Sequence, residues 1–167
     1  KFKVIAHRGL LHGPSIELEN NIENIENNIK KYPYLINELD IWLDSDLIYT
    51  GHNEAARQID LDILSNYSKN LILHIKGINF ESIKSIYLLK SIGEKFHFFS
   101  HQDDDFTITN QGWVWSHPKK GFVKNTICVL PEEVMSLDLA VNQFEFKQLY
   151  GVCSDYPLEL LDLMKSI

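Results

Sequence analysis

Short hydrophobic runs recur along the whole chain, and most of them are rich in β-branched or aromatic residues. Runs of this length and composition are typical of buried β-strands. Polar or turn-forming residues separate one run from the next. The pattern predicts eight strands, at residues 3–7, 35–41, 47–51, 71–75, 96–100, 113–116, 126–130 and 150–154.

Three longer segments carry hydrophobic residues at helical spacing. In the first, Leu18, Ile22, Ile25 and Ile29 lie three or four positions apart, which places them on one face of a helix. In the second, apolar residues recur at every third position before a glycine that is suited to end a helix. The third begins with Pro157, a residue that is favoured in the first turn. The pattern predicts helices at residues 15–31, 80–93 and 157–167.

Strands that alternate with helices or long links pair in parallel through crossover connections. Eight of them predict a closed (β/α)₈ TIM-type barrel of the α/β class. Such a barrel usually has about 250 residues, whereas this chain has 167. We therefore expect one compact barrel domain, residues 1–167, in which several outer helices are shortened or missing, mainly after the third, sixth and seventh strands.

Composition excludes some functions. The formal net charge of −7 and the lack of a Lys/Arg-rich face argue against nucleic-acid binding. No apolar run approaches the roughly 18 residues of a membrane helix, so no membrane span is expected. Cys128 and Cys153 both lie in apolar strand-like runs, where reduced and buried thiols are ordinary, and this favours a cytoplasmic location. The pattern leaves the oligomeric state open.

Polar residues gather where the predicted strands end. In a TIM-type barrel the carboxyl ends of the strands meet at one mouth, and the active site is built there. Side chains from six strands should therefore converge on one place. These residues are His7 and Arg8, Glu38 and Asp40, His52, His74 and Lys76, Ser100 and His101, and Ser154 and Asp155.

Glu38 and Asp40 are two positions apart, so on a strand they share one face, which in a barrel is the interior. His74 and Lys76 have the same spacing. Two buried acids are costly unless they are paired or bind a cation, and oxygen ligands of this kind suit Mg²⁺ or Ca²⁺. We expect Glu38, Asp40 and His74 to share one divalent cation.

Each of these signals has an ordinary structural explanation as well. Glu38 and Asp40 could form a salt-bridged or solvated strand end. His74 could be a hydrogen-bonded core histidine, and His52 could be a turn residue. Their repetition at one strand end after another is what favours a site. His12, His97 and His117 are interpreted as surface or packing residues.

The motifs AHRG, ELEN, NELDIWL, YTGHNE, LHIK and GVCSDYP occur in this order between residues 4 and 157. This series resembles the glycerophosphodiester phosphodiesterase family. The resemblance implies a (β/α)₈ barrel, two catalytic histidines and a divalent cation held by carboxylates. By motif, His7 and His52 match the acid–base pair, Arg8 the phosphate-binding arginine, Glu38 and Asp40 the metal ligands, and Lys76 the lysine that contacts phosphate.

Two positions depart from the family pattern. His74 stands where a third metal-binding glutamate is usual, and Asn53 stands where an aspartate usually follows the GH turn. An imidazole binds Mn²⁺ or Zn²⁺ well and Ca²⁺ poorly. We expect a divalent cation, with Mg²⁺ first and Ca²⁺, Mn²⁺ or Zn²⁺ as alternatives. The chain is most similar to a small, compact subgroup that is associated with polysaccharide biosynthesis.

The favoured function is a metal-dependent phosphodiesterase that cleaves a small glycerol-type or other alcohol phosphodiester by acid–base catalysis with two histidines. In such a reaction, Arg8 and Lys76 would bind the charge that develops on the phosphate oxygens. Two other functions stay open: a catalytically inactive barrel that binds a phosphorylated sugar or polysaccharide precursor, and a phosphomonoesterase.

The segments HQDDD and WVWS are outside these core motifs. His101, Gln102 and Asp104 follow the fifth predicted strand, and Trp115 lies in the sixth. We expect the four to line the part of the site that holds the alcohol group of the substrate. The alternative for Trp115, and for Trp113 on the same strand face, is packing in the core.

Overall fold

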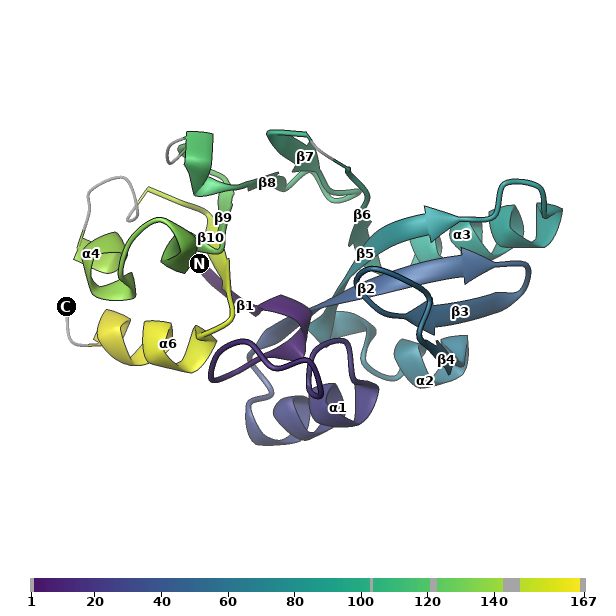
Figure 1. Cartoon of the computed structure of the whole chain (residues 1–167), viewed down its shortest axis with the longest axis horizontal. Coiled ribbons are helices and arrows are strands. Elements are labelled where there is room, and N and C mark those ends of the chain that lie inside the picture. Colours follow the sequence, from purple (N-terminus) through teal and green to yellow (C-terminus); the bar gives the residue numbers. More distant parts are fainter. Residues whose placement is uncertain (1, 103, 121–122, 143–147, 166–167) are drawn as a thin grey trace.

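The computed structural model describes residues 2–102, 104–120, 123–142 and 148–165. The described chain has an α/β fold in which one mixed sheet carries the helices on its outer side (Figure 1). No helix among these residues has both the length and the apolar character that a membrane crossing requires.

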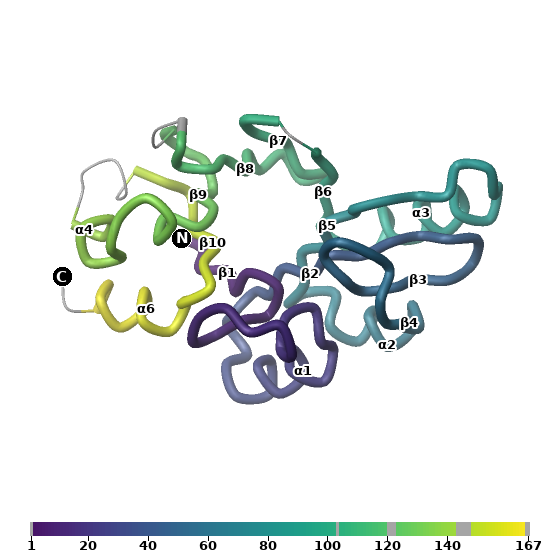
Figure 2. The backbone as a smooth tube through the Cα atoms, in the orientation of Figure 1, coloured from purple at the N-terminus to yellow at the C-terminus, as the bar shows by residue number. Residues whose placement is uncertain are grey.

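Seven strands of the sheet run parallel, in the order β6-β5-β2-β1-β10-β9-β8. In Figure 2 they follow one another around an arc that places β1 in the middle, between β2 and β10. Parallel neighbours require crossovers, which the helices and loops on the outer side provide. The seven are β1 (Lys3–Ala6), β2 (Ile36–Asp44), β5 (Leu71–Ile78), β6 (His97–Phe99), β8 (Val114–Ser116), β9 (Ile127–Val129) and β10 (Gly151–Ser154).

The prediction of a parallel barrel strand at 47–51 is wrong. The strand found there, β3 (Leu47–Thr50), runs antiparallel to β2, and β4 (Arg57–Ile59) runs antiparallel to β3. The cause is the length of the link. Only Ser45 and Asp46 separate β2 from β3, so the chain forms a hairpin, with Ser45 at φ 56°, and has no room for a crossover.

The two ends of the arc meet through a loop residue. Among the described residues no strand pair joins β6 to β8; β7 (Phe106–Ile108) pairs antiparallel with β8 instead. The turn after β7 contains Asn110, whose backbone N–H donates to the carbonyl of Phe98 at 2.9 Å. Its side chain accepts from Phe98 N–H and donates to the Phe96 carbonyl, both at 2.9 Å. Asn110 therefore binds β6 as a neighbouring strand would.

The helices are short, as the length of the chain requires. The first predicted helix begins at residue 22 rather than 15, because Asn20 has φ 53° and the Asn21 side chain caps the first turn. The second runs past Gly93, which does not end it. The helix after β4 and the helix after β9 span only one or two turns. The helices are α1 (Ile22–Lys31), α2 (Leu61–Ser65), α3 (Ile83–Lys95), α4 (Leu137–Asn142) and α6 (Pro157–Lys165).

The inner face of the arc is divided between a core and a polar end. Ile72, His74 and Lys76 alternate along β5, so their side chains share that face. At its amino-terminal end Ile72 packs in a buried cluster with Ile5 and Trp115. Towards the carboxyl end of the strand, polar side chains replace the apolar ones. Apolar packing therefore holds the amino-terminal ends of the strands, and the polar side chains at the carboxyl ends are available to form a site.

Candidate active site at the carboxyl ends of the strands

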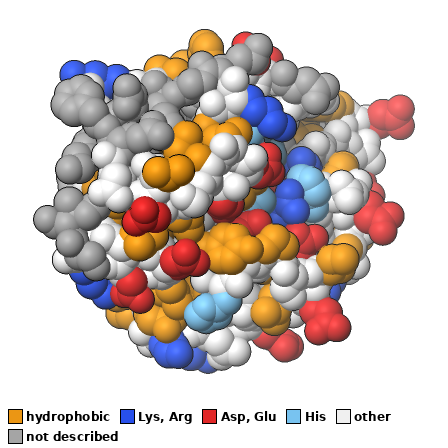
Figure 3. Space-filling view, turned by 60° about the vertical axis from the view of Figure 1, so that its left-hand side comes forward, with side chains coloured by type: hydrophobic (Ala, Val, Ile, Leu, Met, Phe, Trp, Pro, Cys, Tyr) orange, Lys and Arg blue, Asp and Glu red, His pale blue; other side chains and the backbone are white. Residues whose placement is uncertain are grey.

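A pocket of about 290 Å³ lies where the parallel strands end. Figure 3 shows a face of the molecule that is hollowed, where histidine, basic and acidic side chains gather. The pocket brings together the residues to which the sequence analysis gave a catalytic, substrate-binding or metal-binding role. These residues are His7, Arg8, Glu38, Asp40, His52, His74, Lys76, His101, Gln102, Asp104 and Trp115. Ser100, Ser154 and Asp155, which were also expected at the strand ends, are not among the lining residues.

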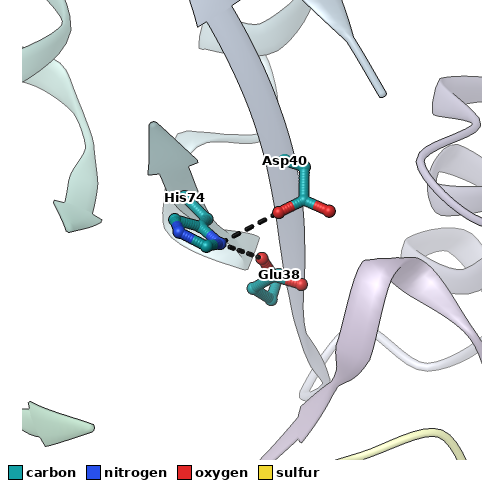
Figure 4. Close-up of side chains that lie close together, drawn as sticks. All are labelled: Glu38, Asp40 and His74. Atoms are coloured by element: carbon teal, nitrogen blue, oxygen red, sulfur yellow. Dashed lines mark ion pairs between the residues drawn. The ribbon is translucent and has the colours of Figure 1, made fainter. Parts of the chain in front are cut away.

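Glu38, Asp40 and His74 form the metal-binding geometry that the sequence predicted. One potential ligand atom of each lies within 4.8 Å of the others. The Nδ1 atom of His74 is 2.9 Å from an Asp40 oxygen and 3.7 Å from a Glu38 oxygen (Figure 4). Ligands that share one ion at about 2.0–2.6 Å have such separations. The donor set fits a divalent cation.

The charges of this cluster also fit a cation. Burial raises the pKa of Glu38, and the nearby charge of Asp40 raises it further. For Asp40 burial acts in the same direction, but hydrogen bonds from His52 and His74 outweigh it and hold the pKa well below its usual value. The imidazole Nε2 of His74 is buried and has no hydrogen-bond partner among the described residues. A bound cation would stabilise both carboxylates in their charged form.

The HRG segment forms a tight turn directly after β1. Arg8 has φ 50° and Gly9 has φ 73°, both in the left-handed region. A Cβ atom on Gly9 would lie 2.5 Å from Ile25 of α1, so only glycine fits there. The turn directs the backbone N–H of Arg8 at a Glu38 oxygen, 2.9 Å away. The strained backbone at Arg8 thus also contacts Glu38 of the candidate cation site.

The Arg8 guanidinium lies between three groups of the pocket. It donates to Glu19 at 2.8 Å and contacts His52 Nε2 at 3.0 Å. Its Nε lies 3.4 Å from Asp40. Asn20, beside Glu19, donates to Asp40 at 3.0 Å and accepts from the Asp40 backbone N–H. The loop that carries ELEN therefore holds both Arg8 and Asp40, a candidate metal ligand.

Each predicted catalytic histidine is held by a carboxylate at Nδ1. His52 Nδ1 lies 3.0 Å from Asp40, and His7 Nδ1 lies 2.7 Å from Asp155. Burial disfavours the charged form of His7, but the hydrogen bond to Asp155 and the charge of Glu38 outweigh this and raise its pKa. In both rings Nε2 is then the atom that could exchange protons with a substrate, although in this structure His52 Nε2 contacts Arg8.

The remaining predicted residues form the other side of the pocket. His101 stacks on His74 with ring centroids 4.8 Å apart. Gln102 and Asp104 are exposed at the rim. Trp115 is only 5% exposed and packs against Phe99 in the inner core, so it is a core residue whose ring also reaches the pocket.

The sequence interpretation missed several residues that hold the site. Glu19 and Asn20 belong to a motif that it noted, but their partners were not predicted. Glu132 follows β9 and accepts from Ser154 Oγ at 2.8 Å and from the Asp155 backbone N–H at 2.7 Å, which fixes the residue that holds His7. His117, interpreted as a surface or packing residue, lines the pocket. Their contacts depend on loop conformation, which hydrophobic periodicity does not report.

This fold is shared with solved structures of glycerophosphodiester phosphodiesterases. The enzyme from Parabacteroides distasonis aligns over 99% of this chain and 97% of its own, with a TM-score of 0.57 at 13% identity. A putative enzyme from Galdieria sulphuraria aligns over 99% and 98%, with a TM-score of 0.52 at 10% identity. The enzyme from Agrobacterium tumefaciens aligns over the full length of both chains, with a TM-score of 0.50 at 10% identity.

At the level of the fold, these structures confirm the resemblance that the motifs indicated. No protein-family model matches the sequence, and no functionally curated protein matches it either.

Proposed function

We propose that the protein is a metal-dependent phosphodiesterase that cleaves a small glycerol-type or other alcohol phosphodiester. The observation that carries the proposal is the convergence, in one pocket, of two carboxylate-held histidines, an arginine and a three-residue cation site. A phosphodiesterase needs each of these parts: groups that bind the phosphate charge, groups that move protons, and a site for a cation.

Arg8 and Lys76 would bind the phosphodiester. Both line the pocket, and a guanidinium suits a bidentate contact with two phosphate oxygens. On binding, the Arg8 NH2 group would exchange its contact with His52 Nε2 for a phosphate oxygen. That exchange frees His52 at the moment when a base or acid is needed.

His7 and His52 would transfer the protons. As the P–O bond to the alcohol breaks, one Nε2 accepts the proton of the attacking hydroxyl and the other donates a proton to the departing alkoxide. The attacking group is either water or a neighbouring hydroxyl of the substrate, and the second choice gives a cyclic phosphate. Asp155 and Asp40 hold the two rings in the required tautomer.

Glu38, Asp40 and His74 would hold the divalent cation, which supplies Lewis-acid stabilisation of the charge on the phosphate oxygens. Two carboxylates alone favour Mg²⁺, and the imidazole adds affinity for Mn²⁺ or Zn²⁺.

The alcohol group of the substrate would lie against the other side of the pocket. His101, Gln102 and Asp104 can bond its hydroxyls, and the Trp115 ring offers an apolar surface. In this proposal the barrel is closed, and the Asn110 contacts replace a β6–β8 strand pair.

A turnover assay on glycerophosphodiesters and on an aryl phosphodiester, with Mg²⁺, Mn²⁺, Zn²⁺ or EDTA, tests the proposal. The expected result is turnover that needs a cation and that is lost on chelation. Phosphate monoesters are the comparison substrates. Faster turnover of monoesters would favour a phosphomonoesterase, and tight binding without turnover of any ester would favour the inactive, sugar-phosphate-binding alternative.

The histidines give a first prediction. His7→Ala and His52→Ala should each lower turnover about 100-fold or more, because each removes a general acid or base. The variant that keeps a near-normal rate with an aryl leaving group, but loses it with an alkyl one, identifies the general acid. His12→Ala, an exposed histidine outside the pocket, is the control. Small and equal losses in both variants would contradict the catalytic roles.

A further inference from the structure

A second pocket lies at the opposite ends of the strands. It has a volume of about 310 Å³ and shares no lining residue with the candidate active site. Its walls come from the amino-terminal ends of β1, β2, β5 and β6 and from the residue just before β8. In this order, these five segments contribute Lys3, Ile36, Leu71, His97 and Trp113. The pocket is therefore a separate cavity on the same framework.

Basic side chains gather around this cavity. Lys3, Lys69 and Lys95 line it, and no aspartate or glutamate does. The ion pairs that lysines form in the described part of the chain involve other lysines, on α3, on α6 and near Glu133. In a chain with a formal net charge of −7, three lysines that line a pocket without an acidic lining residue, and that form no ion pair among the described residues, should create a local site of positive potential.

His97 and Trp113 add a donor and an apolar wall. The Thr109 hydroxyl accepts from the Trp113 backbone N–H at 3.0 Å and lies 2.7 Å from His97 Nε2. The hydrogen of the Thr109 hydroxyl can then be donated to Nε2 of His97. The proton of the neutral His97 ring is then on Nδ1. No hydrogen bond among the described residues uses Nδ1. The Trp113 ring packs edge-on against His97, and the Lys3 ammonium lies 5.6 Å from a Trp113 ring centroid.

We propose that this pocket binds a small anion with two linked phosphate groups. A single carboxylate would leave most of the positive charge unmatched, whereas two linked phosphates carry about three negative charges at neutral pH. Lysine is a common ligand of phosphate, which it binds as a point charge. The half-buried Trp113 ring can pack against the organic group that carries the phosphates.

Calorimetric titration of the protein with inorganic pyrophosphate, in EDTA and at fixed salt, tests this proposal. We expect saturable binding to one site, with shifts of the Trp113 indole and His97 ring signals in NMR spectra. Lys69→Ala combined with Lys95→Ala should weaken binding about 10-fold or more, because two of the three phosphate-facing charges are lost. Lys84→Ala combined with Lys90→Ala removes the same charge from the exposed side of α3 and should leave the affinity within about twofold.

Three results would overturn the proposal. Equal weakening in both double variants would assign the binding to general surface charge. Loss of binding in Lys76→Ala, with no effect of the Lys69 and Lys95 changes, would place the anion in the candidate active site. Absence of saturable binding, or equal affinity for citrate, would remove the assignment to linked phosphates. The four substituted lysines are exposed, and thermal unfolding of both double variants checks that they fold.

Discussion

Asp40 contacts four other side chains of the candidate active site. One carboxylate oxygen accepts from Asn20 and also contacts His52 and Arg8, and the other lies 2.9 Å from His74. Replacing Asp40 would therefore change the candidate cation site, the proposed phosphate-binding arginine and a proposed catalytic histidine together. Substitutions at residues with fewer partners separate these roles better.

His74 is such a residue for the cation site. His74→Ala should weaken cation binding about 10- to 100-fold, since a buried ligand is lost. His74→Glu gives an all-oxygen ligand set and should raise affinity for Mg²⁺ relative to Zn²⁺. Calorimetric titration of metal-free protein measures both. His101→Ala, which removes only the stacked neighbour, is the control, and unchanged affinities in both His74 variants would place the cation elsewhere.

Asp155 is the corresponding residue for His7. Asp155→Asn should lower the pKa of His7, because the carboxylate that stabilises the imidazolium is gone, and should lower turnover about 10-fold or more. An NMR titration of His7 and the pH profile of kcat measure the two effects. Asp138→Asn, an exposed change on α4, is the matched control. An unchanged His7 pKa would show that Asp155 does not act on that ring.

Among the elements, the β7–β8 hairpin has a special position, because it connects the two ends of the sheet. Asn110 binds β6 directly, the Thr109 hydroxyl lies 2.7 Å from Nε2 of His97 in β6, and the Thr107 hydroxyl donates to the carbonyl of Ser100, just after β6, at 3.1 Å. The same hairpin carries Trp115 and Thr107 into the pocket of the candidate active site. Its attachment to β6 thus sets the position of one wall of that pocket.

Asn110→Ala should lower the free energy of unfolding by about 1–3 kcal/mol, because it leaves the Phe98 N–H and the Phe96 carbonyl without their side-chain partners. Urea denaturation measures the change. Gln111→Ala, an exposed substitution at the next position, should have little effect. If the two variants are equally stable, the Asn110 side chain does not contribute to the attachment.

Periodicity predicted the elements better than their directions. The run at 47–51 was correctly predicted as extended, but only the two-residue link after β2 decides that it pairs antiparallel. The candidate site was likewise predicted only in part. Residues at strand ends were predicted together because parallel strands fix where their ends lie. Glu132 and Asn20 reach the site through loop geometry and a left-handed backbone, which no pattern of hydrophobic residues encodes.

The stability of the whole molecule should depend on His97. Burial and the charge of Lys3 lower the pKa of His97 from 6.5 to about 4. Between these values the unfolded chain binds a proton that the folded chain does not bind, so stability falls as the pH drops from 6.5 towards 4. Above this range the residue has no such effect.

His97→Gln removes this titration and keeps a polar partner for Thr109. As the pH drops from 6.5 towards 4, the free energy of unfolding of the variant should therefore fall less steeply than that of the unchanged protein. Chemical denaturation at a series of pH values gives the slopes. His12→Gln, on the surface, should keep the original slope, and a His97→Gln slope equal to the original would refute the assignment.

β1 is paired with β10, and His7 with Asp155, across 148 positions of sequence. During synthesis on a ribosome, β1 emerges long before β10, so the edge of β1 that faces away from β2 has no partner strand until β10 follows. Contacts of such sequence separation slow folding, and the unpaired edge of β1 is meanwhile open to wrong strand pairing. We therefore expect the His7–Asp155 contact to be among the last parts of the protein to form, and chaperones that cover strand edges would act before the candidate active site is complete.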